Sequence, residues 1–292
     1  MISTRSAPGP ALPLKRDITL AYALTFVVAV LIAVESAAGI LLGSIRLYGV
    51  DPATATSVSV SAAGVLVPGF LAHDAFNFLV GLPVLLVTVW LARRGSLVGL
   101  LLWPGALFYV LYSYALYLVG APLNLLFLPY VALVAISAFT TIGLVASIDG
   151  DSVRQRLAGA IPPRAIGGLL VVLALMTAGQ DATGAVTTAL ASIVPVDPMA
   201  HRVWIVDMAI EVPAVLTGGV LLWRRESLGY LAVAGLLLQY GMTPVGLAAI
   251  MVLHAVSTGS PLDPGTPIAL LVFAAAAFMP LGLVIRGLAS VR

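Results

Sequence analysis

The sequence predicts an all-α protein that crosses a membrane several times. Of its 292 residues, 61% are hydrophobic and only 9% are charged, whereas a soluble domain carries about 25% charged residues. Its mean hydropathy is +1.12. Eight apolar runs are each long enough to cross the hydrocarbon core of a bilayer, which takes about 20 residues as a helix. Lipid offers no hydrogen-bond partner to a free backbone amide, so we expect each run to be helical.

The eight predicted spans cover residues 18–45, 72–92, 96–119, 123–147, 165–190, 203–223, 227–254 and 267–288. The first run is longer than the apolar part of a secretory signal, which has about 7–15 residues, so we expect it to remain as a span. The fifth is the least regular, because Gln180, Asp181 and Gly184 interrupt it. Residues 1–17 form a short basic tail, and residues 148–164 form a linker between the fourth and fifth spans.

Basic residues predict the orientation of these spans. If the N-terminus lies inside the cell, all of the 14 lysine and arginine residues except Arg46 and Arg202 fall in inner segments. The positive-inside rule states that lysine and arginine are concentrated in the cytoplasmic segments, as they are in this orientation. We therefore expect a multi-pass protein of the inner (plasma) membrane with both termini cytoplasmic and the lipid bilayer as its surroundings.

Two parts of the chain resemble each other. LARRGSLVG (91–99) and LWRRESLGY (222–230) share Arg-Arg-x-Ser-Leu, 131 positions apart (222 − 91). Pro83 and Pro213 also correspond, which pairs Asn77 with Asp207. These matches predict two parallel four-helix repeats, residues 18–147 and 165–292, that are related by an axis along the membrane normal.

Polar residues inside the spans are the candidate site. The segment WIVDMAIEVPAV (204–215) carries two acids that are four positions apart and therefore share one face of a helix. Ionisable residues inside a membrane are costly and are often functional. The predicted site, which we expect to bind substrate or protons, comprises Asp207, Glu211, Glu35, Asp181, Asn77, Gln239 and Tyr109. We expect these residues to line an outward-facing cavity; the structural alternative is that the acids are hydrogen-bonded groups that join helices.

Other polar residues carry a weaker signal. We expect four residues to occupy interfacial positions at the outer helix ends, without a metal: His73, Asp74, His201 and His254. Three further tyrosines of the third span do not share one face with Tyr109, and we expect them to serve in packing or in the interfacial belt: Tyr112, Tyr114 and Tyr117. The arginine pairs are expected to anchor the topology first and to bind lipid headgroups second.

Several classes of function are excluded or unsupported. The chain has no cysteine, so it has no disulfide, thiolate metal site or iron–sulfur cluster. Its only lysine, Lys15, lies in the tail, which excludes a retinal Schiff base within the helices. No sequence signature supports nucleotide-driven transport, zinc proteolysis or serine hydrolysis. The net charge of +2 is too small to indicate a nucleic-acid partner, and we expect no cofactor.

The segment DMAIEVPAVLTGGVLLWRRESLGYLAVAGLLL (207–238) resembles the second and third helices of DoxX-type four-helix membrane proteins. Those helices show an acid in a glycine-rich helix, then a basic turn, then a helix of small residues. The resemblance implies that each half of the chain is one four-helix unit and that Glu211 is the family-like acid. Its counterpart in the first half, Gly81, departs from the pattern. Some DoxX-type proteins work beside quinone-linked oxidoreductases.

Three functions remain open on the sequence alone. The first is a proton-coupled permease for a small solute, and the second is a membrane subunit or enzyme that handles a lipid-soluble substrate such as a quinone. The third is a structural partner of other membrane proteins. A path to the inner face would favour the first, a lateral opening near the acids the second, and a solidly packed interior the third. The sequence does not define the oligomeric state.

Overall fold

The structure is a computed structural model that describes residues 12–41, 69–121, 123–191, 198–259 and 261–290. Within these ranges the chain is helical and forms no β-strand beyond two isolated bridges. Eight helices are long and apolar enough to span a membrane: Thr19–Leu41, Gly69–Arg93, Leu97–Gly120, Phe127–Ser147, Pro163–Leu190, Ala200–Trp223, Ser227–Val256 and Gly265–Ala289. The predicted class and the number of spans are therefore confirmed, and the fifth span is one continuous helix.

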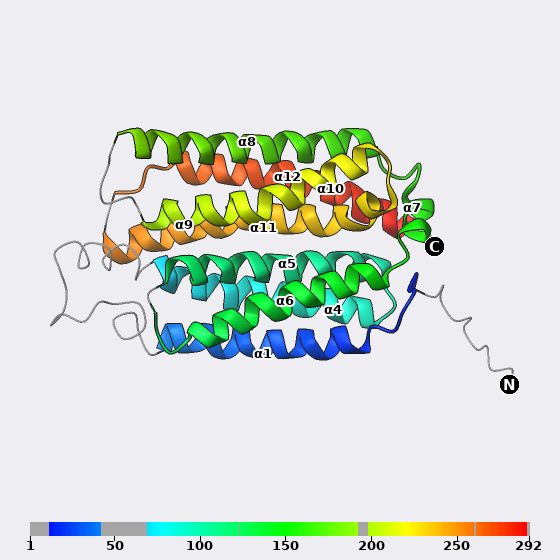
Figure 1. Cartoon of the computed structure of the whole chain (residues 1–292), viewed down its shortest axis with the longest axis horizontal. Coiled ribbons are helices and arrows are strands. Elements are labelled where there is room, and N and C mark those ends of the chain that lie inside the picture. Colours follow the sequence, from blue (N-terminus) through cyan, green and yellow to red (C-terminus); the bar gives the residue numbers. More distant parts are fainter. Residues whose placement is uncertain (1–11, 42–68, 122, 192–197, 260, 291–292) are drawn as a thin grey trace, which may run out of the picture.

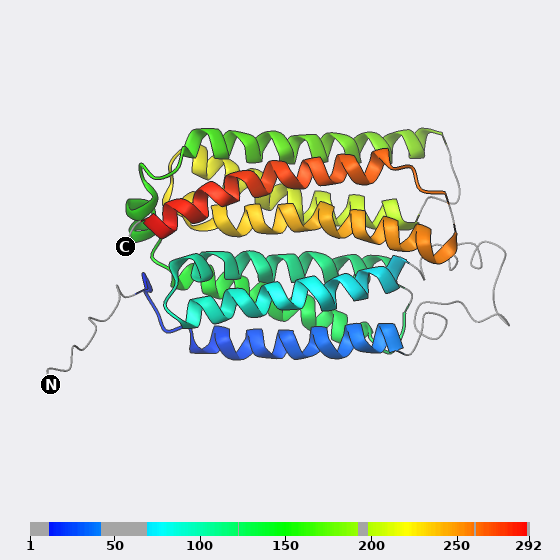
Figure 2. The same ribbon diagram turned by 180° about the vertical axis from the view of Figure 1, so that it is seen from behind.

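The helices lie side by side in two groups (Figures 1 and 2). The first group contains α1 (Thr19–Leu41), α4 (Leu82–Arg93), α5 (Leu97–Gly120) and α6 (Phe127–Ser147). The second group contains α8 (Pro163–Leu190), α9 (Pro198–Val206), α10 (Val212–Trp223), α11 (Ser227–Thr258) and α12 (Gly265–Ser290). The groups meet where α5 packs against α11. Of the eight spans, α5 is the most completely enclosed by protein.

One end of the bundle carries most of the basic residues, and we call it the basic end. The turns with Arg93, Arg94, Arg224 and Arg225 lie there, together with the short helix α7 (Gly150–Leu157), the start of α1 and the end of α12 (Figure 1). Asp149 caps α7 and forms an ion pair with Lys15, N–O 3.6 Å. The hydrogen bond from Ser152, assisted by the Asp151 backbone N–H and by Lys15, holds the pKa of Asp149 below its usual range.

Two wide helical turns interrupt the α-helical pattern. They are the π-turns η1 (Asn77–Gly81), which leads into α4, and η2 (Asp207–Glu211), which leads into α10. Each turn ends two residues before a proline: Gly81 precedes Pro83, and Glu211 precedes Pro213. A proline has no N–H, and its ring clashes with the carbonyl four residues earlier in a continuous α-helix. The wider turn relieves that conflict, and such turns are frequent at functional sites.

Structural features of the two groups recur 130 positions apart (207 − 77), not 131. The two π-turns have this spacing, and so do the positive-φ residues Gly95 (80°) and Arg225 (62°) and the N-caps Ser96 and Glu226. The spacing of the Arg-Arg-x-Ser-Leu match is one residue longer than that of these structural features. At a spacing of 130, Tyr109 is paired with Gln239.

The contact between α5 and α11 depends on two glycines, Gly105 and Gly235, which are themselves 130 positions apart. A Cβ atom on Gly105 would lie 2.3 Å from the Cα and carbonyl oxygen of Gly235, and a Cβ atom on Gly235 would lie 2.9 Å from the Gly105 nitrogen. Glycine at both positions lets the two backbones touch, as small residues do between membrane helices. The fold therefore places α5 and α11 close enough for their polar residues to serve both groups.

Candidate functional site

The buried polar residues form two clusters in the half of the bundle remote from the basic end. All seven residues of the predicted site are buried, with at most 6% of each exposed. The structure divides them between the two clusters. The first cluster contains Glu35, Asn77 and Tyr109, together with His73, Asp74, Ser113, Tyr114 and Tyr117. The second cluster contains Asp181, Asp207, Glu211 and Gln239, together with Tyr112 and Thr243.

A pair of carboxyl groups forms one side of the first cluster. Glu35, on α1, accepts hydrogen bonds at Oε2 from the Tyr114 hydroxyl (2.6 Å) and from Ser36 Oγ (3.2 Å). The Asp74 carboxyl accepts a hydrogen bond from the Tyr117 hydroxyl, and the rings of Tyr114 and Tyr117 stack with their centroids 5.3 Å apart. Each of the two buried acids of the first cluster is thus held by a tyrosine of α5.

An amide and an imidazole form the other side of the first cluster. Asn77 Oδ1 accepts from the Tyr109 hydroxyl and from Ser113 Oγ, each at 3.0 Å. Ser113 Oγ also lies 2.9 Å from His73 Nε2. Because the single Ser113 proton is directed to Asn77, this network assigns the donor N–H to His73 Nε2. His73 Nδ1 then faces no hydrogen-bond partner among the described residues.

Arg202 comes from the second group of helices and packs beside the first cluster. It is only 3% exposed, and its guanidinium lies 4.4 Å from the centre of the Phe70 ring. The sequence placed Arg202 in an outer segment just before the span predicted to begin at residue 203, and in the structure it lies near the start of the spanning helix Ala200–Trp223. A buried cation is thus part of the surroundings of the first cluster.

The second cluster is built across the junction of the two groups. Asp207, in η2, accepts a hydrogen bond at Oδ1 from the hydroxyl of Tyr112, which belongs to α5 (2.6 Å). Asp181, on α8, is also buried, and α8 packs against η2. The second cluster therefore draws its polar residues from both groups of helices.

Glu211 occupies a separate part of the second cluster. Its Oε1 accepts hydrogen bonds from Gln239 Nε2 and from Thr243 Oγ1, the latter at 3.1 Å. The Oε1 atom of Gln239 has no partner in the described part of the chain. The hydrogen-bond partners of Glu211 come from α11, whereas that of Asp207 comes from α5, so the two acids have separate polar surroundings.

The charge balance distinguishes the two clusters. The second contains three carboxyl groups, and no lysine, arginine or histidine is a hydrogen-bond or ion-pair partner of any of them among the described residues. Isolated carboxylates are costly in a membrane interior. No group of three or more His, Cys, Asp or Glu side chains within the described ranges has the geometry to hold a metal ion.

Three tyrosines are the site residues that the sequence analysis missed. Tyr112, Tyr114 and Tyr117 donate to Asp207, Glu35 and Asp74, respectively, so their prediction as packing or belt residues is wrong. Likewise, His73 and Asp74 are buried in the bundle. The three tyrosines point in different directions from α5, and each contacts an acid because other helices surround most of α5. The available signal was the presence of four tyrosines between residues 109 and 117 of one span, since a buried tyrosine hydroxyl usually finds a partner.

An exchange of side-chain size explains why Glu211 corresponds to a glycine. In the first cluster, a Cβ atom on Gly81 would lie 3.0 Å from the ring of Tyr109. In the second, the corresponding positions hold Glu211 and the smaller Gln239, which bond to each other. In the first group of helices, the large Tyr109 on α5 thus faces Gly81 on the preceding span. In the second group, the smaller Gln239 on α11 leaves room for Glu211.

No protein-family model, no curated protein and no solved structure matches this chain, so the resemblance to DoxX-type proteins stays a prediction.

Proposed function

We propose that the protein is a proton-coupled permease for a small solute and that the second cluster is where protons are bound and exchanged. The observation that carries this proposal is the presence of three buried carboxyl groups, Asp181, Asp207 and Glu211, without a basic partner in the described chain. Such acids in membrane proteins mark ion pathways and proton relays.

The arrangement suggests how a proton and a solute compete. With protons bound, the second cluster is neutral. Loss of a proton leaves a carboxylate that attracts a cation or a hydrogen-bond donor. Gln239 Oε1, an acceptor without a protein partner among the described residues, offers a further contact to a solute that carries N–H or O–H groups. A cationic or donor-rich small solute therefore fits the cluster best.

A lateral pocket favours a second candidate, a membrane subunit or enzyme for a lipid-soluble substrate such as a quinone. The pocket has a volume of about 550 Å³ and lies between α5, α10 and α11. Ala209 and Ile210 of the π-turn line it, together with Pro213 and, across the junction, Phe108. Its lining is predominantly apolar, and two of its residues lie between Asp207 and Glu211 in the chain.

We also propose that the chain is a tandem duplication with both halves in the same orientation. The common spacing of 130 residues supports this, as does the contact between the corresponding glycines Gly105 and Gly235, which a two-fold axis along the bundle would produce. The halves differ in one respect: α1 packs on α6, whereas α8 packs chiefly on α10. The gathering of basic residues at one end supports an inner membrane location with both termini cytoplasmic.

Proton flux in proteoliposomes tests the proposed function. The purified protein is reconstituted with an entrapped pH-sensitive dye, and a potassium gradient with valinomycin imposes an inside-negative potential. We expect wild-type protein to acidify the lumen, and we expect Asp207→Asn to abolish this flux because it removes an exchangeable proton from the second cluster. Glu226→Gln is the matched control, since Glu226 is an exposed acid at the basic end and should leave the flux unchanged.

Two results would separate the candidates. Equal flux through wild type and Asp207→Asn would exclude proton exchange at the second cluster. Absence of flux from wild type, combined with Asp207-dependent binding of a short-chain quinone, would favour the second candidate instead.

A further inference from the structure

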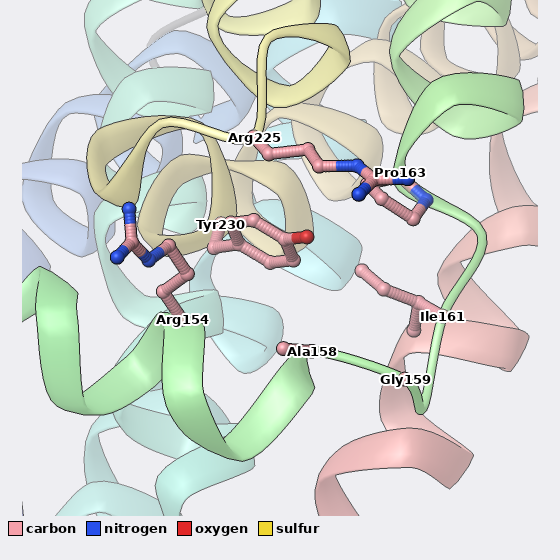
Figure 3. Close-up of a pocket in the computed structure, with 7 residues that line it drawn as sticks. All are labelled: Arg154, Ala158, Gly159, Ile161, Pro163, Arg225 and Tyr230. Carbon is pink, nitrogen blue, oxygen red and sulfur yellow. The ribbon is translucent and has the colours of Figure 1, made fainter.

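A pocket at the basic end has the character of an anion site. It has a volume of about 600 Å³ and lies between the end of α7, the start of α8 and the turn before α11 (Figure 3). Its lining residues are Arg154, Ala158, Gly159, Ile161, Pro163, Arg225 and Tyr230. Two of these are arginines and none is acidic, so the pocket is electropositive. It lies at the opposite end of the bundle from the acid clusters, and its role does not depend on the proposed function.

The hydrogen-bond donors of this pocket are not used by the described part of the chain. Tyr230 is only 2% exposed, and its hydroxyl points into the pocket (Figure 3). The side chains of Arg154 and Arg225 are exposed to solvent and form no ion pair or hydrogen bond with any described residue. All three donors are therefore available to a ligand that enters the pocket.

The backbone adds to the positive character of the pocket. The long helix α8 begins at Pro163, and no side chain caps its first turn. The first N–H groups of a helix have no intrahelical partner, and together with the helix dipole they attract anions. Pro163 itself lines the pocket, so this helix terminus lies beside the two arginines.

Arg225 is held in an unusual conformation. It is the one non-glycine residue with positive φ (62°) among the described residues, and its counterpart in the first half is Gly95 (80°). An arginine in the left-handed region costs free energy relative to glycine, and such strain tends to be retained at functional sites. Here the strained residue directs a guanidinium into the pocket (Figure 3).

We infer that this pocket binds a phosphate group, with the guanidinium groups of Arg154 and Arg225 and the hydroxyl of Tyr230 as its donors. A guanidinium matches the oxygen atoms of a phosphate bidentately. The phosphate has two possible sources. One is the headgroup of an anionic phospholipid, because Arg225 and Tyr230 lie at the end of a span, at the level of the lipid headgroups. The other is a soluble phosphate compound that reaches the pocket from the aqueous side.

Thermal unfolding of the whole protein in nanodiscs tests this assignment and identifies the source. Phosphatidylcholine nanodiscs are titrated with inorganic phosphate, with potassium chloride at equal ionic strength as the reference. In a second series, part of the phosphatidylcholine is replaced by phosphatidylglycerol. A rise in Tm with inorganic phosphate supports a soluble ligand, and a rise only with phosphatidylglycerol supports a headgroup.

Three variants locate the effect. Arg225→Gly should fold, because glycine occupies the corresponding position in the first half, and it should weaken the response to the effective probe by about tenfold or more. Arg154→Gln should also weaken it. Arg224→Gln, which removes an adjacent charge outside the pocket, should leave the response unchanged. The inference is overturned if neither probe raises the Tm of wild type, or if Arg225→Gly and Arg154→Gln both respond as wild type does.

Discussion

Alanine at Gly105 or at Gly235 is expected to lower the free energy of unfolding by about 1–3 kcal/mol or more, the usual cost of an overpacked core. The added Cβ atom at Gly105 would lie 2.3 Å from the backbone of Gly235. A backbone cannot move aside as a flexible side chain can, so α5 and α11 would have to separate. Chemical unfolding of the protein in nanodiscs measures the effect.

Two other glycines provide matched controls. Gly143 on α6 and Gly168 on α8 have no atom within 4 Å of an added Cβ. Alanine at these helical positions is expected to stabilise the fold by about 0.5–1 kcal/mol, because alanine loses less backbone entropy than glycine. The proposed duplication further predicts that Gly105→Ala and Gly235→Ala have similar effects. Equal behaviour of all four variants would contradict the proposed contact between the groups.

Arg202→Gln is expected to lower the free energy of unfolding more than replacement of an exposed arginine does. The change removes the interaction of the buried guanidinium with the Phe70 ring, 4.4 Å from the ring centre. A cation–π contact that is shielded from water contributes about 2 kcal/mol. Unfolding in nanodiscs again provides the measurement, with Arg164→Gln as the control because Arg164 is exposed at the basic end.

The second cluster should respond differently. Asp207→Asn removes a carboxyl group that has no basic partner among the described residues, so no opposite charge is left buried and unpaired. We expect its stability to be equal to that of wild type or slightly higher. If Asp207→Asn destabilises the protein as much as Arg202→Gln does, the second cluster is a structural element rather than a site of proton exchange.

The sequence was sufficient to predict the spans and the burial of the acids. Hydropathy over about 20 residues identifies membrane helices well, because lipid imposes a fixed thickness. The same reasoning placed Asp207, Glu211, Glu35 and Asp181 inside the bundle, where the structure finds them. Those predictions depend on distance along a helix, which the sequence determines directly.

The partners of the acids could not be predicted in this way. The hydroxyl donor of Asp207, Tyr112, comes from the other group of helices, and Glu211 is held by Gln239 and Thr243 of α11. These contacts depend on the packing of α5 against α9 and of α10 against α11, which the periodicity of one helix does not encode.

The second cluster is expected to hold protons on its buried carboxyl groups, which have no basic partner among the described residues. Infrared difference spectroscopy of the protein in membranes detects protonated carboxyl groups directly, through their C=O stretching band. At pH 7 we predict bands from wild type that lose intensity in Asp181→Asn and in Asp207→Asn, because each change removes one of these carboxyl groups. Spectra in which neither substitution removes a protonated-carboxyl band at pH 7 would show that the second cluster does not hold protons.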